Sequence, residues 1–147
     1  MESELHKELK LKAKWYLWNK GFRLITLEKT AGYYGIFDVW GINYSSYYTI
    51  GIEVKVSRSD FFAAHKWKER RLNEQNLSRQ GLDWGGANDN YYLCPAGLIK
   101  PNEVGVYGLL WWSGKRLISK KKPKFIKIHL KSKLDQLIGF LQTKPLI

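Results

Sequence analysis

The sequence predicts one α/β domain, a mixed β-sheet of about four to five strands flanked by helices, followed by a basic C-terminal extension. Its 147 residues are the size of one ordinary domain with a single hydrophobic core. Apolar residues recur at helical or strand spacing in the order helix, three strands, helix and two strands. Lysine and arginine are concentrated after residue 112.

The first helix is expected over residues 3–20. Ser3 is a suitable N-cap, Glu4 lies in the first turn, and Gly21 follows the last helical residue. Glu8 and Glu4 continue the second of two apolar stripes backwards in steps of three and four. One stripe holds Leu5, Leu9, Ala13, Tyr16 and Leu17, and the other holds Leu11, Trp15 and Trp18. Two carboxylates therefore lie in line with a large aromatic surface.

Three strands should follow the first helix. Residues 22–30 alternate and are rich in β-branched side chains, residues 31–35 form a turn, and residues 36–43 and 47–56 complete the set. Alternation places Glu53 on the polar face of the third strand, opposite its apolar face.

A second helix is expected from Ser57 or Ser59, either of which can cap it, to about Asn76. Asp60 would lie in its first turn. Residues 78–90 contain three glycines together with Asn, Asp and Ser, so they form a loop or a disordered insertion.

Two further strands are predicted at residues 91–95 and 105–112. Residues 124–130 resemble a strand, and Ser132 begins a capping box before a C-terminal helix. We therefore expect a core over residues 1–112. The remainder, 113–147, should form a basic strand and helix extension that packs on the same domain.

The net charge of +12 indicates a polyanionic partner, and DNA is the partner we expect. Between residues 113 and 147 there are ten lysines and arginines and one aspartate. A solubilising tail is the alternative interpretation of this segment. The C-terminal helix can dock on the core, pair with another chain in a homodimer, or lie on an anionic membrane, in that order of preference, so no membrane partner is expected.

Composition also excludes several classes of protein. The charged N-terminus and the short apolar runs predict neither a secretory signal nor a membrane span, so a soluble protein of the cytoplasm or nucleoid is expected. Cys94 is the sole cysteine, which excludes an internal disulfide and argues against a zinc site.

Two carboxylates are expected to meet on adjacent strands. If Ser45 and Ser46 form a two-residue hairpin loop, antiparallel pairing places Asp38 opposite Glu53. A four-residue loop over 43–46 is equally credible, and it keeps both acids on one face as diagonal neighbours. Either register brings Lys55 beside them on the same face of the sheet.

Like charges placed together on a sheet must share a proton or hold a cation. Mg²⁺ prefers carboxylate oxygens, and the main-chain carbonyl of Val54 could supply one more hard ligand. Lys55 could orient or deprotonate a water, or neutralise charge on a reacting phosphate. The alternative is a cross-strand salt bridge of Lys55 with Glu53 or Asp38 on an exposed face. Apolar residues flank both acids, so an arrangement suited to phosphodiester hydrolysis is preferred.

These residues carry a resemblance to a known family. "IFDVWGIN", "YYTIGIEVKV" and the following helix resemble the D…(D/E)xK core of the PD-(D/E)xK nuclease superfamily. "IEVKVSRSDFFAAHKW" with "YYLCPAGLIKPNEVGVYGLL" is similar to the MmcB-like DNA-repair branch and its phage or mobile-element relatives. The resemblance covers residues 3 to about 112 and implies a restriction-endonuclease-like core.

The resemblance implies a Mg²⁺-dependent DNA endonuclease of repair, recombination or phage DNA processing, with Mn²⁺ able to substitute for Mg²⁺. Asp38 and Glu53 would bind the metal and Lys55 would serve the attacking water. Glu8 or Glu4 of the first helix would complete the site, with Glu8 slightly favoured. The alternative is a catalytically inactive, nucleic-acid-binding protein with the nuclease fold.

Two departures from the family pattern are visible. Phe37 stands where the pattern has proline before the aspartate, and residues 78–90 look like an insertion. Candidates for contacts with DNA phosphates are Arg58 and Lys66 at the second helix and three consecutive lysines of the extension, Lys120, Lys121 and Lys122. A solvated helix face is the equal alternative for the first two.

Overall fold

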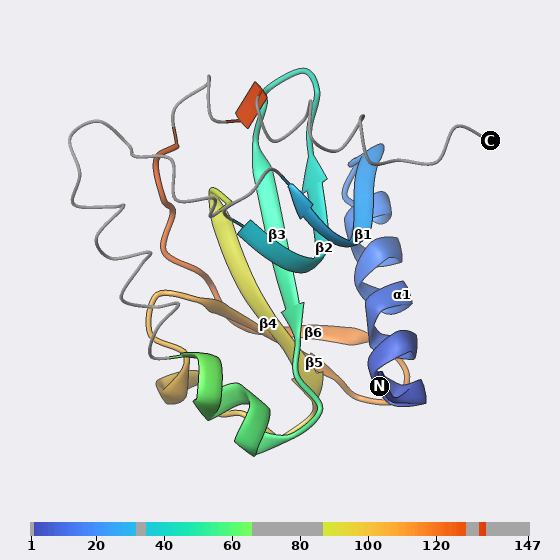
Figure 1. Cartoon of the computed structure of the whole chain (residues 1–147), viewed down its shortest axis with the longest axis vertical. Coiled ribbons are helices and arrows are strands. Elements are labelled where there is room, and N and C mark those ends of the chain that lie inside the picture. Colours follow the sequence, from blue (N-terminus) through green and yellow to red (C-terminus); the bar gives the residue numbers. More distant parts are fainter. Residues whose placement is uncertain (1, 32–34, 66–86, 129–132, 135–147) are drawn as a thin grey trace.

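The structure is a computed structural model that describes residues 2–31, 35–65, 87–128 and 133–134 (Figure 1). Six strands form one mixed sheet. A second helix, described over residues 58–65, follows the third strand. The other elements are α1 (Glu4–Asn19), β1 (Leu24–Ala31), β2 (Gly35–Ile42), β3 (Thr49–Val54), β4 (Asp89–Pro95), the short 3₁₀ helix η1 (Pro101–Glu103), β5 (Gly108–Trp112) and β6 (Leu117–Lys121).

The strands lie in the sheet in the order in which they occur in the chain. β1, β2 and β3 are antiparallel neighbours, β3, β4 and β5 are parallel, and β6 returns antiparallel to β5. The predicted α/β class, with a mixed sheet flanked by helices, is therefore confirmed. The number of strands is larger than expected because β6 belongs to the sheet.

The basic extension was expected to pack on the core as a separate strand and helix. Its residues 117–121 instead form β6, an edge strand of the central sheet. Ser113 closes the preceding turn, since its hydroxyl accepts from the N–H groups of Lys115 and Arg116, each at 3.2 Å. Gly114 has φ +97°, a conformation that other residues adopt only with strain. Two lysines end the strand, which suits an edge exposed to solvent.

Each face of the sheet packs against one helix. On one face, Leu9, Ala13 and Leu17 of α1 form a buried cluster with apolar residues of β2 to β5, among them Val39, Ile50, Ile52, Val54, Leu93 and Leu110. A separate cluster joins Phe61 of the second helix to Tyr92, Cys94 and Leu109 and to the η1 region. The predicted apolar face of β3 is thus the face under α1.

The β2–β3 hairpin has the register predicted for a two-residue loop, with Val39 opposite Ile52 and Ile42 opposite Thr49. The loop itself differs from both predictions, because six residues, 43–48, lie between Ile42 of β2 and Thr49 of β3. Asn43 N–H donates to the Tyr48 carbonyl at 2.8 Å, and the Asn43 amide oxygen accepts from two N–H groups of the turn. The asparagine side chain therefore organises a loop that serine pairs alone would not form.

The second helix is capped by Ser57, whose hydroxyl accepts from the N–H of Asp60 at 3.3 Å. Its expected continuation to Asn76 lies outside the described residues, as do residues 78–86 of the predicted loop. β4 begins at Asp89, so the end of that predicted loop is already in the sheet.

The strand predicted at residues 124–130 is wrong for its described part, because 124–128 form no strand. Ile126 is nevertheless fully buried, and its N–H donates to the Asn88 carbonyl at 2.8 Å. The Asn88 amide returns a bond to the Ile126 carbonyl, also at 2.8 Å. These two hydrogen bonds with Asn88, the residue before β4, hold the segment in place without a strand ladder. The predicted C-terminal helix lies outside the described residues, apart from 133–134.

Candidate active site

Asp38 lies where β2 separates from β3. The last paired residues of the two strands are Val39 and Ile52, and beyond them the Asp38 carboxylate accepts from the N–H of Val54 at 2.7 Å. The Asp38 carboxylate thus accepts a backbone N–H that a carbonyl of the neighbouring strand would accept in a continued ladder. The Asp38 side chain keeps 24% of its surface exposed, so its carboxylate is open to a ligand as well as bonded to the strand.

Glu53 and Lys55 lie together, as the alternation of β3 predicts. The Lys55 Nζ is 4.0 Å from the Glu53 Oε2. Only 8% of the Glu53 side chain and 14% of the Lys55 side chain are exposed, so the pair is not the solvated surface salt bridge considered above. The Lys55 N–H donates to the Leu93 carbonyl at 2.9 Å, which fixes its backbone beside β4. A buried carboxylate beside a cation is typical of functional sites as well as of structural ion pairs.

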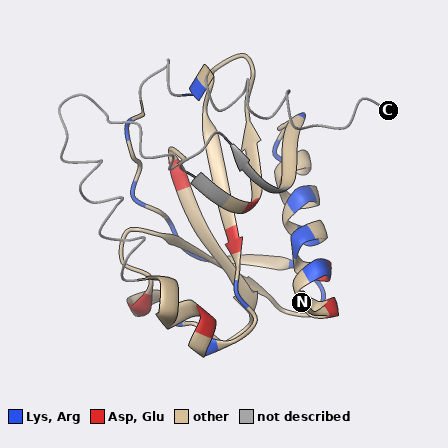
Figure 2. Ribbon diagram, viewed as in Figure 1, with Lys and Arg blue, Asp and Glu red and all other residues tan. Residues whose placement is uncertain are grey.

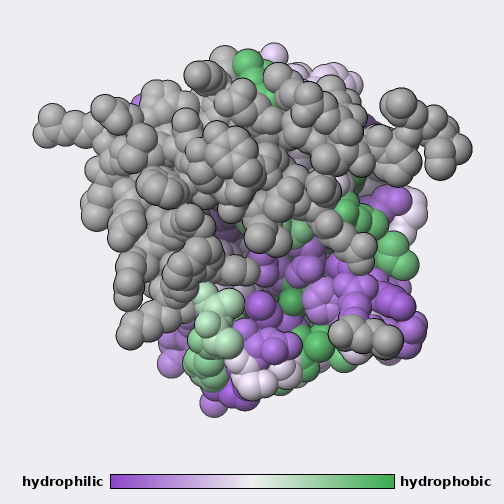
Figure 3. All heavy atoms as spheres, viewed as in Figure 1, coloured by the Kyte–Doolittle hydropathy of each residue, from purple (hydrophilic) through white to green (hydrophobic). Residues whose placement is uncertain are grey.

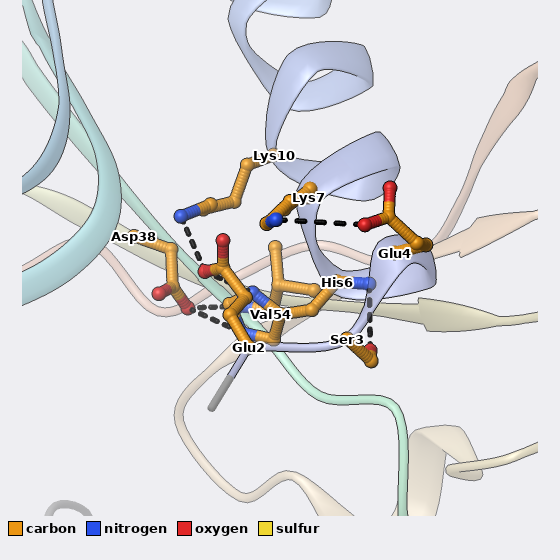
Figure 4. A network of polar contacts seen from close by, with 8 residues as sticks. All are labelled: Glu2, Ser3, Glu4, His6, Lys7, Lys10, Asp38 and Val54. Carbon is orange, nitrogen blue, oxygen red and sulfur yellow. Dashed lines mark hydrogen bonds and ion pairs between the residues drawn. The ribbon is translucent and has the colours of Figure 1, made fainter.

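The N-terminal end of α1 approaches Asp38 through His6 (Figure 4). The His6 Nε2 is 3.7 Å from the Asp38 Oδ2, and the His6 Nδ1 is 2.8 Å from the Glu2 Oε2. The imidazole thus stands between two carboxylates. Lys10, almost fully buried, also contacts the Glu2 carboxylate. This hydrogen bond from Lys10 lowers the pKa of Glu2, so Glu2 stays ionised and compensates the buried ammonium.

Glu4 and Glu8, predicted to complete the site, are both exposed and are not brought to Asp38 or Glu53. The Glu4 carboxylate pairs with Lys7 at 3.5 Å. The reason is helical phase, because the stripe that continues into these acids carries Trp15 and Trp18, which are themselves exposed. The buried stripe of α1 is the other one.

Sequence reasoning therefore missed Glu2, His6 and Lys10. A usable signal was present, since His6 precedes Leu9 by three residues and Lys10 precedes Leu17 by seven, which places both along the edge of the buried stripe. Both stripes are apolar, however, and the pattern alone favours neither for burial.

The donor chemistry of these residues fits Mg²⁺. Asp38, Glu53 and the Val54 carbonyl offer hard oxygen ligands, which Mg²⁺ prefers. Within the ranges that the structure describes, no three His, Cys, Asp or Glu side chains are gathered in a way that could hold a metal ion by themselves. Mg²⁺ is usually held by one or two carboxylates, several waters and substrate phosphates, so this limited set suits it better than zinc.

Of the residues predicted to contact DNA, Arg58 has internal partners. Its guanidinium forms a two-point ion pair with Glu103, at 2.7 and 3.1 Å, and donates to the Leu98 carbonyl at 2.7 Å. These bonds tie the second helix to the η1 region. The Arg58 guanidinium is therefore occupied by internal bonds that hold two parts of the fold together. This arrangement does not favour the predicted contact with a DNA phosphate. Lys66 lies outside the described residues.

The three lysines of the extension lie at the end of β6. Lys120 is exposed and stacks over Trp111 with its Nζ 4.7 Å from the ring centroid. The Lys121 ammonium contacts the Gly105 carbonyl. Lys122 is exposed. Figure 2 shows the positive charge of the described chain on α1 and on this last segment.

No protein-family model and no curated protein matches the chain. Among solved structures, the chain is similar to SPO1766, a protein of unknown function from Silicibacter pomeroyi. The TM-score is 0.70 at 19% sequence identity, over 97% of this chain and 87% of the other. At this identity the likeness concerns the fold alone. Within the described ranges, no helix is long and apolar enough to cross a membrane.

Proposed function

We propose that the protein is a Mg²⁺-dependent endonuclease of PD-(D/E)xK type, with a restriction-endonuclease-like core, that hydrolyses phosphodiester bonds of DNA. The observation that carries the proposal is the burial of Glu53 beside Lys55 on β3, together with the partly exposed Asp38 carboxylate at the point where β2 separates from β3. Burying a carboxylate and an ammonium costs desolvation free energy, and functional sites commonly carry this cost.

The chain's own residues would divide the work as follows. Asp38 is held in one orientation by the Val54 N–H, with His6 on its other side. Asp38, Glu53 and the Val54 carbonyl would hold Mg²⁺, which supplies a Lewis acid for charge that develops on the phosphate. The order imposed by the Val54 hydrogen bond reduces the reorganisation needed when the substrate binds.

Lys55 would act on the attacking water or on the phosphate oxygens. Its ammonium lies 4.0 Å from the Glu53 carboxylate. A charged, partly shielded ammonium donates hydrogen bonds strongly and stabilises negative charge in the transition state. On this proposal His6 takes the place that the family pattern gives to a helix-borne glutamate, and it acts by positioning Asp38.

DNA is the proposed substrate because the chain carries a net charge of +12, which provides the electrostatic part of binding to a polyanion. Repair, recombination or phage DNA processing is the proposed setting, and it rests on the resemblance of the core motif. Mn²⁺ is expected to substitute for Mg²⁺ because it accepts the same oxygen ligands.

A second candidate is a nucleic-acid-binding protein that has the nuclease fold and does not cut. One observation favours it: Glu53 and Lys55 neutralise one another, and the described residues assemble no set of three side chains ready to hold a metal. Such a protein would bind DNA with the same affinity whether or not a divalent ion is present.

The test is cleavage of supercoiled, linear, single-stranded and branched DNA with Mg²⁺, with Mn²⁺ and with a chelator. We expect metal-dependent products from the wild type and a loss of about 100-fold or more in rate for Glu53→Gln. Asp60→Asn, which removes an exposed acid from the second helix, is the matched control and should cut normally. Identical behaviour of wild type and Glu53→Gln on every substrate would refute the nuclease, and binding of DNA without any cleavage would support the second candidate.

A further inference from the structure

The outward side of α1 carries large apolar side chains that the fold does not cover. Trp15 is 51% exposed, Leu11 49% and Trp18 39%. They lie opposite the stripe that packs on the sheet, and the candidate active site does not use them. Indole rings left in water are costly unless a partner covers them, so this face needs an explanation.

Each of the two indoles has a cation beside it. The Arg23 guanidinium carbon is 3.9 Å from the centroid of the Trp18 ring, and the Lys14 Nζ is 5.1 Å from that of Trp15. Arg23 also donates to the carbonyls of Trp18 and Phe22, at 2.8 and 3.2 Å, so its position is set by the backbone. The two indoles meet edge to face at 6.2 Å. We call Leu11, Trp15, Trp18, Lys14 and Arg23 the α1 outer face.

Most of the charged residues near the α1 outer face are basic. Lys12, Lys14, Lys20 and Arg23 occur between Leu11 and Leu27 without an acidic residue, whereas the exposed Glu4 and Glu8 lie on the same side of α1 nearer its start. Figure 2 shows the basic residues recurring along the helix. Aromatic rings interleaved with fixed cations are the arrangement by which proteins bind single-stranded nucleic acid, with bases on the rings and phosphates on the cations.

We propose that the α1 outer face binds unpaired nucleotides of a nucleic acid. A base stacks on Trp15, a neighbouring base contacts Trp18 on the side that Arg23 leaves open, and Lys14 and Arg23 contact the phosphates between them. The inference rests on the proposed function only in taking nucleic acid as the partner. It requires neither a metal ion nor cleavage.

Two other occupants fit the observations less well. A helix that lies in a membrane surface needs a wide apolar side, but the main apolar stripe of α1 is already buried under the sheet. Where Figure 3 is not grey, hydrophobic residues are interspersed with hydrophilic ones rather than gathered in one broad area. A second copy of the chain would place like-charged faces together, which opposes association.

The experiment measures binding of the full chain to a fluorescent thymidine 15-mer by anisotropy, in a chelator so that nothing is cut. Trp15→Ala should weaken binding by about fivefold or more, because stacking on one aromatic contributes about that factor at least. Trp15→Phe should retain most of the affinity. Tyr44→Ala, which removes a 64% exposed aromatic from the β2–β3 loop, is the matched control and should bind like the wild type.

A duplex of the same length separates stacking from charge. Trp15→Ala should change duplex binding by less than about twofold, since paired bases are not available to the ring. Lys14→Gln should weaken both forms and reduce the salt dependence. Equal losses of Trp15→Ala for the 15-mer and the duplex, or no loss for either, would overturn the inference.

The remaining controls address the alternatives. Binding of the wild type, but not Trp15→Ala, to phosphatidylglycerol vesicles in preference to the 15-mer would overturn the inference in favour of a membrane. A dimer in sedimentation that Trp15→Ala dissociates would overturn it in favour of a second copy. Asp60→Asn, which lies outside both proposed sites, should bind the 15-mer normally. Because binding is measured in a chelator, a failure of cleavage leaves this result intact, and a failure of stacking leaves cleavage to its own test.

Discussion

Asp38 accepts the N–H of Val54 at 2.7 Å, just beyond Val39 and Ile52, the last paired residues of β2 and β3. This bond crosses the point where the two strands separate, so a side chain continues the pairing that the backbone gives up. The same carboxylate faces His6 of α1 at 3.7 Å. Asp38 therefore connects the helix, the hairpin and the proposed metal ligands, and its loss should affect both the fold and the reaction.

Asp38→Asn and Asp38→Ala should separate these two roles. The asparagine keeps an acceptor for Val54, so its free energy of unfolding should stay within about 1 kcal/mol of the wild type. The alanine leaves the Val54 N–H without its acceptor and should cost about 1–3 kcal/mol. Both variants should lose cleavage. Urea unfolding and cleavage rates measure the two effects, and equal stability of the two variants would contradict the structural role.

His6 and Glu8 on α1 offer a direct choice between the geometry and the family pattern. His6→Ala should lower the cleavage rate by about tenfold or more, because Asp38 loses its neighbour on the helix side. Glu8→Gln should cut at the wild-type rate because that side chain is exposed. The rates are compared on the best substrate found with Mg²⁺. If only Glu8→Gln lost cleavage activity, the exposed stripe of α1, and not the side that carries His6, would face the substrate.

Gly51 should tolerate no side chain. A Cβ built there would lie 2.3 Å from the ring of Phe37, which is buried, so Gly51→Ala must displace the ring at a cost of about 1–3 kcal/mol. Gly41→Ala on the neighbouring strand is the control, since its Cβ would meet the end of the Leu17 side chain at 3.2 Å and should cost less. Chemical unfolding measures both. Adding Phe37→Leu to Gly51→Ala should recover part of the loss, and simple additivity would contradict the clash.

The Arg58–Glu103 ion pair should make stability depend on acid pH. Hydrogen bonds from the Arg58 guanidinium and the Lys100 N–H lower the pKa of Glu103 from 4.5 to about 2. A depressed folded-state pKa means that the pair stabilises the fold above the ordinary carboxyl pKa and that this contribution is lost as the pH falls from 4.5 towards about 2.

Thermal midpoints recorded across this range test the point. Glu103→Gln should lower the midpoint at neutral pH and flatten its fall on acidification. Glu4→Gln, which removes a loosely paired exposed carboxylate, should leave the curve unchanged. Parallel curves for the wild type and Glu103→Gln would contradict the assignment.

Much of the fold could be predicted from local pattern. The alternation of β3 correctly separated the apolar residues under α1 from Glu53 and Lys55, because a strand gives its side chains only two directions. Of the two registers left open for β2 and β3, the structure has the one expected for a two-residue loop, although the connection is longer, residues 43–48, and is organised by Asn43. Loops of different length can give the same register, so a correct pairing does not identify its turn.

The helix-borne part of the site could not be predicted in the same way. α1 has two apolar stripes, and the one richer in tryptophan is exposed, so hydrophobicity alone gave the wrong phase and pointed to Glu4 and Glu8. β6 was missed because its lysines suggested a soluble tail. In both cases tertiary structure decided the outcome. The sheet determined which stripe of α1 was buried, and β5 was the strand still available for β6 to pair with. The metal, the reaction and the DNA partner stay predictions.

The position of β6 has a practical consequence for shortening the chain. A cut after residue 112, where the core was expected to end, would remove the strand that pairs with β5. The peptide groups of β5 would then face water beside buried leucines, as a ready template for intermolecular strand addition. Such a fragment should form aggregates visible by light scattering, whereas a fragment ending after residue 128 would retain this protected margin of the sheet.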